Sequence, residues 1–153
     1  MPQTPGVLLA AVLRDERADP HERARAVEDI ADRGLLHLEV ELARLLDDAQ
    51  DLVRGTALIA LLSTWHRAEY LPIARTMSRM DASPSARRDA SLALKWFYLE
   101  TRRYKAEVLR ALARVVLEDK CRSVASSAYN AILNIAAPDR RAFLLDMHAV
   151  YWA

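Results

Sequence analysis

Apolar residues recur every three or four positions along most of this chain, the spacing that gathers them on one side of an α-helix. The pattern is clearest from Leu36 to Leu46, from Leu71 to Met80 and from Tyr104 to Leu117. It predicts an all-helical protein. By residue number, the predicted helices span 5–17, 20–33, 36–47, 50–67, 69–80, 84–101, 103–118, 121–136 and 138–150.

A short phrase of small, basic and aliphatic residues returns along the chain. Val53-Arg54-Gly55-Thr56-Ala57-Leu58-Ile59-Ala60-Leu61 is its best copy, and weaker copies surround Ala26, Ala90 and Ala128. These three alanines and Ala57 are separated by 31, 33 and 38 residues, a length that suits two helices and two turns. Polar turns that favour helix starts precede the copies, at Asp19-Pro20, Asp47-Asp48, Asp81-Ala82-Ser83-Pro84 and Asp119.

The aspartate-rich turn followed by the Val-Arg-x-x-Ala-x-x-Ala-Leu phrase resembles the HEAT-repeat family of α-solenoids. The resemblance is strongest from Asp51 to Leu61 and continues from Asp81 to Leu94. It implies a single domain, a short right-handed α-solenoid of about four antiparallel helix pairs plus a C-terminal capping helix. The implied units are 5–33, 36–67, 69–101 and 103–136, with the closing helix at 138–150.

The phrase also has a direct physical meaning. Ala57 and Ala60 lie one turn apart, and their methyl groups let a neighbouring helix approach closely. Arg54 lies on the flank of that face, where its guanidinium is expected to reach Asp48 or Asp51 of the preceding turn, or the end carbonyls of an adjacent helix. We therefore expect Arg54 to hold successive units in register.

Composition narrows the classes of function. The chain of 153 residues is 52% hydrophobic, and no apolar run approaches the roughly 18 residues of a membrane span. Twenty-two basic residues oppose 21 acidic ones, so a net charge of +1 disfavours general nucleic-acid binding. Cys121 has no partner for an internal disulfide, and a reducing cytoplasm is the expected location. The preference for Arg over Lys fits GC-rich codon usage.

No reaction motif is recognisable: the chain has no phosphate loop, no His-Glu-x-x-His, no paired cysteines and no nucleophile elbow. His37 and Glu41 are spaced for one helix face, and a solvated ion pair is expected there rather than a metal site. Cys121 is expected to be a structural thiol. The sequence therefore predicts a protein that is not an enzyme and uses no cofactor or metal.

The second helix of each unit is expected to line the concave wall of the stack. If the alanines point inward, the residues at the complementary offsets point outward, toward a partner. These predicted partner-binding residues are Arg25, Glu28, Thr56, Ile59, Ser63, His66, Asp89, Leu92, Trp96, Asn130 and Asn134. A change of about 40° in helix phase would instead turn Trp96 into the core, since aromatic residues at helical spacing commonly pack inside.

An aromatic residue among polar neighbours favours protein binding, so the leading hypothesis is a non-catalytic scaffold that binds a protein partner in its concave groove. An inhibitory protein, such as an immunity protein for a bacterial toxin, is one specific form. One alternative is an enzyme like the HEAT-like DNA glycosylases, for which Asp89 and Trp96 are the only parallel. Another is a structural homo-oligomer that stacks through the apolar residues Phe143, Leu144, Val150, Tyr151 and Trp152.

Overall fold

The computed structural model describes residues 5–136, and every regular element within them is helical. The all-helical prediction is thus confirmed for this part of the chain. The α-helices are α1 (Pro5–Arg14), α2 (Pro20–Asp32), α3 (Glu39–Arg44), α4 (Asp51–Leu58), α5 (Leu71–Met80), α6 (Pro84–Thr101), α7 (Lys105–Glu118) and α8 (Arg122–Ala136). The predicted closing helix at 138–150 lies outside the described residues.

Two of the four polar turns cap helices as predicted, and α4, after Asp47-Asp48, follows Gln50 without a side-chain cap. Asp19 accepts hydrogen bonds from the amides of His21 and Glu22 at the start of α2, and the Ser83 hydroxyl accepts one from Ala86 at the start of α6. A proline occupies the first position of both helices, where no amide donor is needed.

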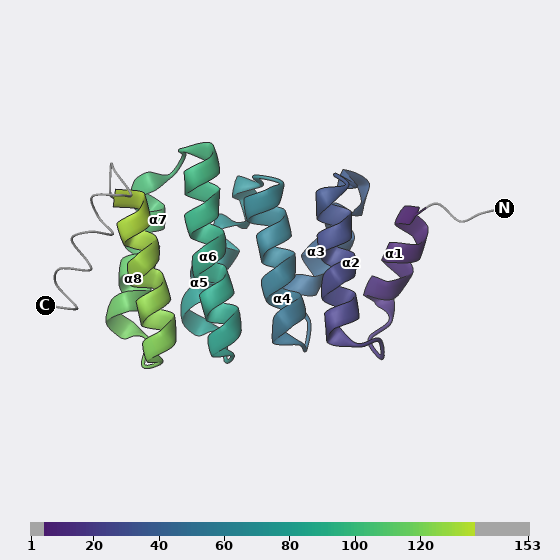
Figure 1. The fold of residues 1–153 in the computed structure, drawn as a ribbon, viewed down its shortest axis with the longest axis horizontal. Helices are drawn as coiled ribbons and strands as arrows, with labels where there is room; N and C mark the ends of the chain where they lie inside the picture. The colour runs from purple at the N-terminus through teal and green to yellow at the C-terminus, as the bar shows by residue number, and fades with distance from the viewer. Residues whose placement is uncertain (1–4, 137–153) are drawn as a thin grey trace, which may run out of the picture.

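The helices stand side by side in a row, in two layers (Figure 1). The nearer layer holds α2, α4, α6 and α8, each in contact with the next. The other layer holds α3, α5 and α7, of which α5 contacts α6 and α7, and α7 contacts α8. No helix of residues 5–136 is long and apolar enough to cross a membrane.

Alanines make the close packing between neighbouring helices possible. Ala57, Ala90 and Ala128 are completely buried, and Ala26 is 4% exposed. Larger side chains fill the remaining space, with Phe97 the largest that is fully buried. The recurring alanines therefore face neighbouring helices, as their spacing predicts.

Arginines join the successive turns at one end of the stack. Nε and Nη2 of Arg54 donate to the two carboxylate oxygens of Asp81, at 2.9 and 2.7 Å. Nη1 of the same side chain donates to the backbone carbonyls of Asp48 and Ala49. Arg54 therefore ties the turn before α4 to the turn before α6. The expected carboxylate partner, Asp48 or Asp51, is wrong, because the acid is Asp81, in the turn before α6.

The same joint recurs on both sides of Arg54. Arg87 donates through two nitrogens to Asp119, while its Nη1 bonds the carbonyls of Asp81 and Ala82. Arg23 binds Asp48 in a bidentate fashion and donates to the Leu13 carbonyl. We call these three sites, centred on Arg23, Arg54 and Arg87, the arginine joints.

Two predicted helices differ from the structure. The segment 36–47 contains only a short α3 between two 3₁₀ turns, Leu36–Leu38 and Leu45–Asp47. The segment 50–67 begins as α4 but continues as a π-helix over Ile59–Thr64, with the Trp65 amide bonded to the Ala60 carbonyl five residues back. Because each π-type bond spans one more residue, side chains after Ile59 rotate away from the α-helical phase.

Candidate functional site

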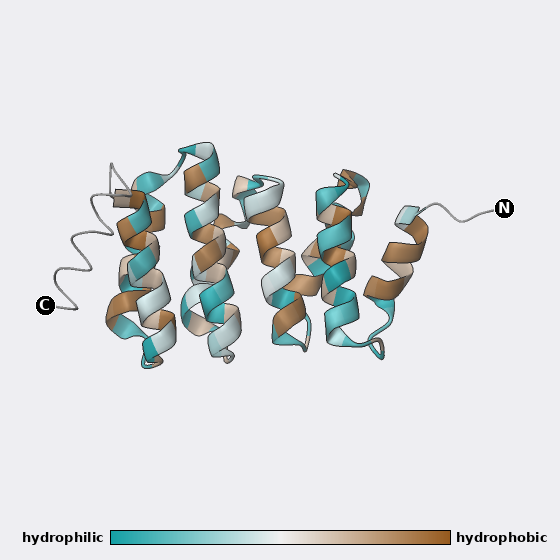
Figure 2. Cartoon of the chain, viewed as in Figure 1, coloured by the Kyte–Doolittle hydropathy of each residue, from teal (hydrophilic) through white to brown (hydrophobic). Residues whose placement is uncertain are grey.

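The open side of α2, α4, α6 and α8 forms a continuous surface, which we call the wall. Because α6 contacts α4 and α8 on its flanks and α5 and α7 behind, its remaining side is left uncovered. Figure 2 shows a mixed wall: the visible side of α2 is mostly hydrophilic, and that of α4 is more hydrophobic. The wall thus changes character along the row.

Helix α6 supplies the centre of the wall. Asp89, Leu92 and Trp96 follow at intervals of three and four residues, which places them on one side of the helix. Leu92 is half-buried and Trp96 is 41% exposed. The alternative helix phase, with the Trp96 ring in the core, is therefore wrong. The ammonium of Lys95 lies 4.3 Å from the centre of the Trp96 ring, a cation–π contact at the edge of the wall.

Asp89 lies where α6 approaches α4 most closely. A β-carbon at Gly55 would overlap the Asp89 Oδ2 atom and lie 2.9 Å from the Asp89 Cβ. Glycine is required at this position because the Asp89 side chain occupies the space that a larger residue would need. Burial raises the pKa of Asp89, the carboxylate of Asp51 raises it further, and Arg88 lowers it.

The flanks of the wall come from the other helices of this layer. Arg25 and Glu28 are exposed on α2. Thr56 is half-buried on α4, and Ile59, the first residue of the π-helix, is half-buried too. The Thr56 hydroxyl is engaged by the Leu52 carbonyl, so it is bound to its own helix.

On α8, Asn130 is exposed and Asn134 is half-buried, and the Asn134 amide donates to the Asn130 carbonyl. These asparagines are not core residues, in agreement with their predicted exposure.

Ser63 and His66 do not lie on the wall. Ser63 is buried, and its hydroxyl donates to the Ala93 carbonyl of α6, at 3.0 Å. His66 has a left-handed backbone (φ 55°) and lines a separate hollow with Arg103 and Tyr104, beside the loop between α6 and α7. The π-helix explains the error at Ser63, since its wider turn moves later side chains off the α-helical offset. The error at His66 has another cause, because the helix ends at Thr64 and His66 lies in the turn that follows.

The sequence holds three pairs of adjacent arginines, Arg87-Arg88, Arg102-Arg103 and Arg140-Arg141. Arg87 is committed to its joint with Asp119, whereas Arg102 and Arg103 lie over the rings of Tyr98 and Tyr104. Arg140 and Arg141 lie outside the described residues. Four other arginines lie together in the structure, and sequence reasoning missed them. Helices α5 and α7 each contribute two that are four residues apart, a spacing visible in the sequence: Arg75, Arg79, Arg110 and Arg114.

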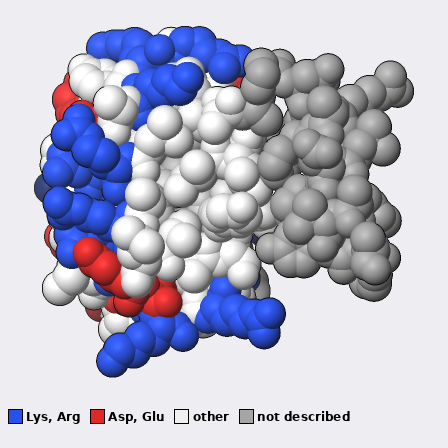
Figure 3. All heavy atoms as spheres, turned by 90° about the vertical axis from the view of Figure 1, so that its left-hand side faces the viewer, with Lys and Arg blue, Asp and Glu red and all other residues white. Residues whose placement is uncertain are grey.

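The end of the row formed by α7 and α8 includes a broad uncharged area. Figure 3 shows this area bordered by basic side chains along one edge, at the top and at the bottom, with a group of acidic side chains at the lower left. Helix α8 accounts for much of it, because no charged residue follows Arg122 in that helix. The apolar residues proposed for homo-oligomer stacking, Phe143 to Trp152, lie outside the described residues.

Reactive groups are sparse in the described part of the chain. Within residues 5–136, no three His, Cys, Asp or Glu side chains come together as metal ligands would. Glu41 pairs with Arg14 and Arg44 in place of the expected partner His37. A hydrogen bond between Ser123 and Cys121 lowers the pKa of the Cys121 thiol.

Comparison of the chain with protein-family models, with curated proteins and with solved structures finds no significant match. Its function therefore has to be argued from the wall and the grooves themselves.

Proposed function

We propose that this chain is a short right-handed α-solenoid of HEAT-like, antiparallel helix pairs that binds a protein partner in the cytoplasm, without catalysis. Contacts between neighbouring helices and the recurring arginine joints support the solenoid. The partner binds the wall, with α6 at its centre.

The observation that carries this proposal is the exposed Trp96 ring on a helix that is fixed on every other side. Trp96 and Leu92 form an apolar centre, and polar groups on α2 and α8 surround it, as in protein interfaces where an aromatic anchor dominates affinity. The joints at Arg54 and Arg87 hold α6 before a partner arrives, so little conformational entropy is lost on binding.

An inhibitor is the most specific form of this proposal. A preformed wall suits covering the cleft of another protein, as an immunity protein of a bacterial toxin does. Exposed charges at the α2 end, Arg25 and Glu28, would set the orientation of the partner more than its affinity.

The test is affinity purification from the native host with three baits: the unaltered chain, Trp96→Ala and Leu117→Ala. Leu117 is the matched control, because it is an apolar residue, 84% exposed, on α7 in the other layer. The partner should be retained by Leu117→Ala and lost from Trp96→Ala, with a drop in affinity of about tenfold or more when measured with the purified partner. Equal retention by both variants would contradict the proposal.

A second candidate is a DNA glycosylase-like enzyme, favoured by Asp89 and Trp96 sharing the open side of α6. Binding of duplex DNA that weakens steeply with salt, together with base release abolished by Asp89→Asn, would establish the enzyme in place of the protein-binding module.

A further inference from the structure

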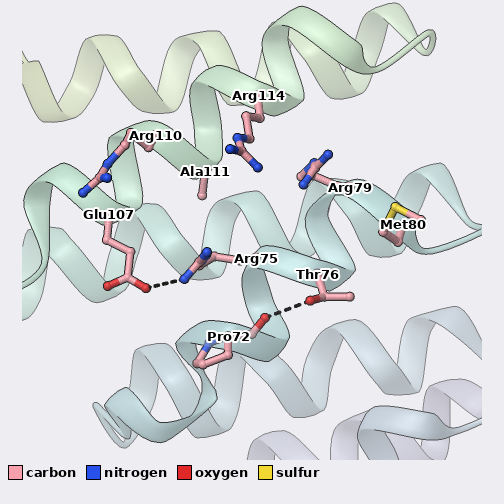
Figure 4. Close-up of a pocket in the computed structure, with 9 residues that line it drawn as sticks. All are labelled: Pro72, Arg75, Thr76, Arg79, Met80, Glu107, Arg110, Ala111 and Arg114. Atoms are coloured by element: carbon pink, nitrogen blue, oxygen red, sulfur yellow. Dashed lines mark hydrogen bonds and ion pairs between the residues drawn. The ribbon is translucent and has the colours of Figure 1, made fainter.

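A hollow of about 520 Å³ lies between α5 and α7, in the layer opposite the wall. Two arginines from each helix line it: Arg75 and Arg79 from α5, Arg110 and Arg114 from α7. The members of each pair are four residues apart, so their side chains follow one another by about 6 Å along each helix. We call this hollow the arginine groove (Figure 4).

The arginine groove carries more positive charge than its own carboxylates neutralise. Arg75 pairs with Glu107 and Arg79 with Glu118, both at 2.8 Å. Arg110 donates to the Ala106 carbonyl of its own helix. Among residues 5–136, the Arg114 side chain makes no hydrogen bond or ion pair, and in Figure 4 it extends from α7 into the groove.

Four arginines and one carboxylate, that of Glu107, therefore line a concave site, while Glu118 reaches Arg79 from outside this lining. Like charges that line one hollow are stabilised when an anion lies between them, and guanidinium groups bind carboxylates through paired hydrogen bonds. The existing ion pairs with Glu107 and Glu118 are solvent-exposed, so an incoming carboxylate can exchange with them at little cost.

An apolar groove adjoins the arginine groove on the other side of α5. It has a volume of about 650 Å³ and shares Pro72, Thr76 and Met80 with the arginine groove. Two of its lining residues are exposed large apolar side chains, Ile73 at 39% and Met80 at 72%. Helix α5 is thus a ridge with a basic groove on one side and an apolar groove on the other.

We propose that these two grooves together bind an acidic, leucine-rich type of peptide segment from another protein, with its carboxylates in the arginine groove and its aliphatic side chains over Ile73 and Met80. A nucleic acid would satisfy the arginines but leave the apolar groove uncovered. Its phosphates would also meet the exposed carboxylate of Asp47 at the rim of that groove. The composite lining therefore selects a polypeptide, and it lies on the layer opposite the wall.

The experiment uses three fluorescein-labelled helical peptides of about 16 residues, which span about 24 Å. The first carries Glu and Leu on adjacent faces, the second has Gln for every Glu, and the third has Ser for every Leu. Anisotropy at about 50 mM salt, where charge pairs are weakly screened, should show binding of the first peptide, with the other two weaker by about tenfold or more.

Charge variants of the full chain locate the binding. Arg110→Gln with Arg114→Gln should weaken the first peptide about tenfold. The matched control, Arg17→Gln with Arg33→Gln, removes the same charge from exposed positions elsewhere and should leave binding unchanged. Met80→Ser should weaken the first peptide but not the third. Trp96→Ala should leave all three unchanged, which separates this groove from the wall.

Three results would overturn the proposal: no binding of the first peptide, equal binding of the first and third peptides, or duplex DNA that binds more tightly than the first peptide. Circular dichroism checks that each variant is folded. If the variant with Arg110→Gln and Arg114→Gln unfolds, Met80→Ser tests the proposal in its place. Met80 is 72% exposed and contributes little to packing, so its replacement should leave the fold intact.

Discussion

Two sets of arginines in this protein do opposite things. In the arginine joints the side chains are largely buried: Arg23 is 4% exposed, Arg54 16% and Arg87 15%. In the arginine groove, Arg75 is 50% and Arg79 34% exposed. The residue type is the same, so the surroundings decide whether a guanidinium holds the fold or remains free to bind a ligand.

The difference lies in the geometry of the bonds. A joint arginine binds both oxygens of a carboxylate and also donates to backbone carbonyls, as Arg54 does. A groove arginine donates to one carboxylate oxygen, as Arg75 does to Glu107 and Arg79 to Glu118. Bidentate, desolvated pairs are costly to break, whereas exposed pairs contribute little to stability.

Between the two sets of arginines, the largest expected effect is that of Arg54→Ala. It leaves the mostly buried Asp81 carboxylate without its guanidinium and removes the donor to two carbonyls, so we expect a loss of about 3 kcal/mol in the free energy of unfolding. Urea denaturation measures it. Arg75→Ala is the matched control and should cost less than about 0.5 kcal/mol. Equal losses of stability in Arg54→Ala and Arg75→Ala would contradict the distinction between the arginine joints and the arginine groove.

The close approach of α4 and α6 predicts a second, smaller effect. Gly55→Ala should cost about 1–2 kcal/mol, because the new methyl group collides with Asp89. In an Asp89→Ala background the same change should cost less, because the Asp89 carboxylate is gone, although the Cβ of residue 89 still lies 2.9 Å from the new methyl group. A double-mutant cycle without coupling between the two sites would contradict the contact.

The smallest effect is a difference in pH dependence. Hydrogen bonds from Arg87 lower the pKa of Asp119, so the stability it contributes is complete above its unfolded pKa, about 3.9, and is lost as pH falls through the lower folded value. Asp89, with its raised pKa, acts in the opposite sense: stability declines as pH rises from about 3.9 through its folded value.

Melting temperatures between about pH 2 and pH 7 test this difference. Asp119→Asn should flatten the loss of stability toward low pH, and Asp89→Asn should instead remove a decline toward neutral pH. Parallel pH profiles for the two variants would show that the joint and wall carboxylates do not differ as described.

Much of the fold could be predicted from local signals. The recurring alanines, the capping residues Asp19 and Ser83 and the apolar spacing are short-range features, and they located α2 and α6 to within one residue. The phase after Ile59 could not be predicted, because the π-helix depends on the neighbouring helices against which its side chains pack. One such contact is the bond from the Trp65 ring nitrogen to the Ala31 carbonyl.

The candidate site was less accessible from the sequence. Trp96 was placed correctly because α6 is an uninterrupted helix, so one offset applies along its length. The partner of Arg54 could not be predicted in the same way, because Asp48, Asp51 and Asp81 are equally plausible acids until the distance between the turns is known. The arginine groove needs two helices brought together, α5 and α7, and no local pattern reports that contact.

The central claim is that α6 has one side locked into the stack and one side free for a partner. Adjacent residues test it most directly. Phe97→Ala should cost about 3–5 kcal/mol in the free energy of unfolding, because Phe97 is completely buried. Trp96→Ala should cost less than about 1 kcal/mol, since its ring lies on the open side of the helix. A loss for Trp96→Ala as large as that for Phe97→Ala would contradict the account.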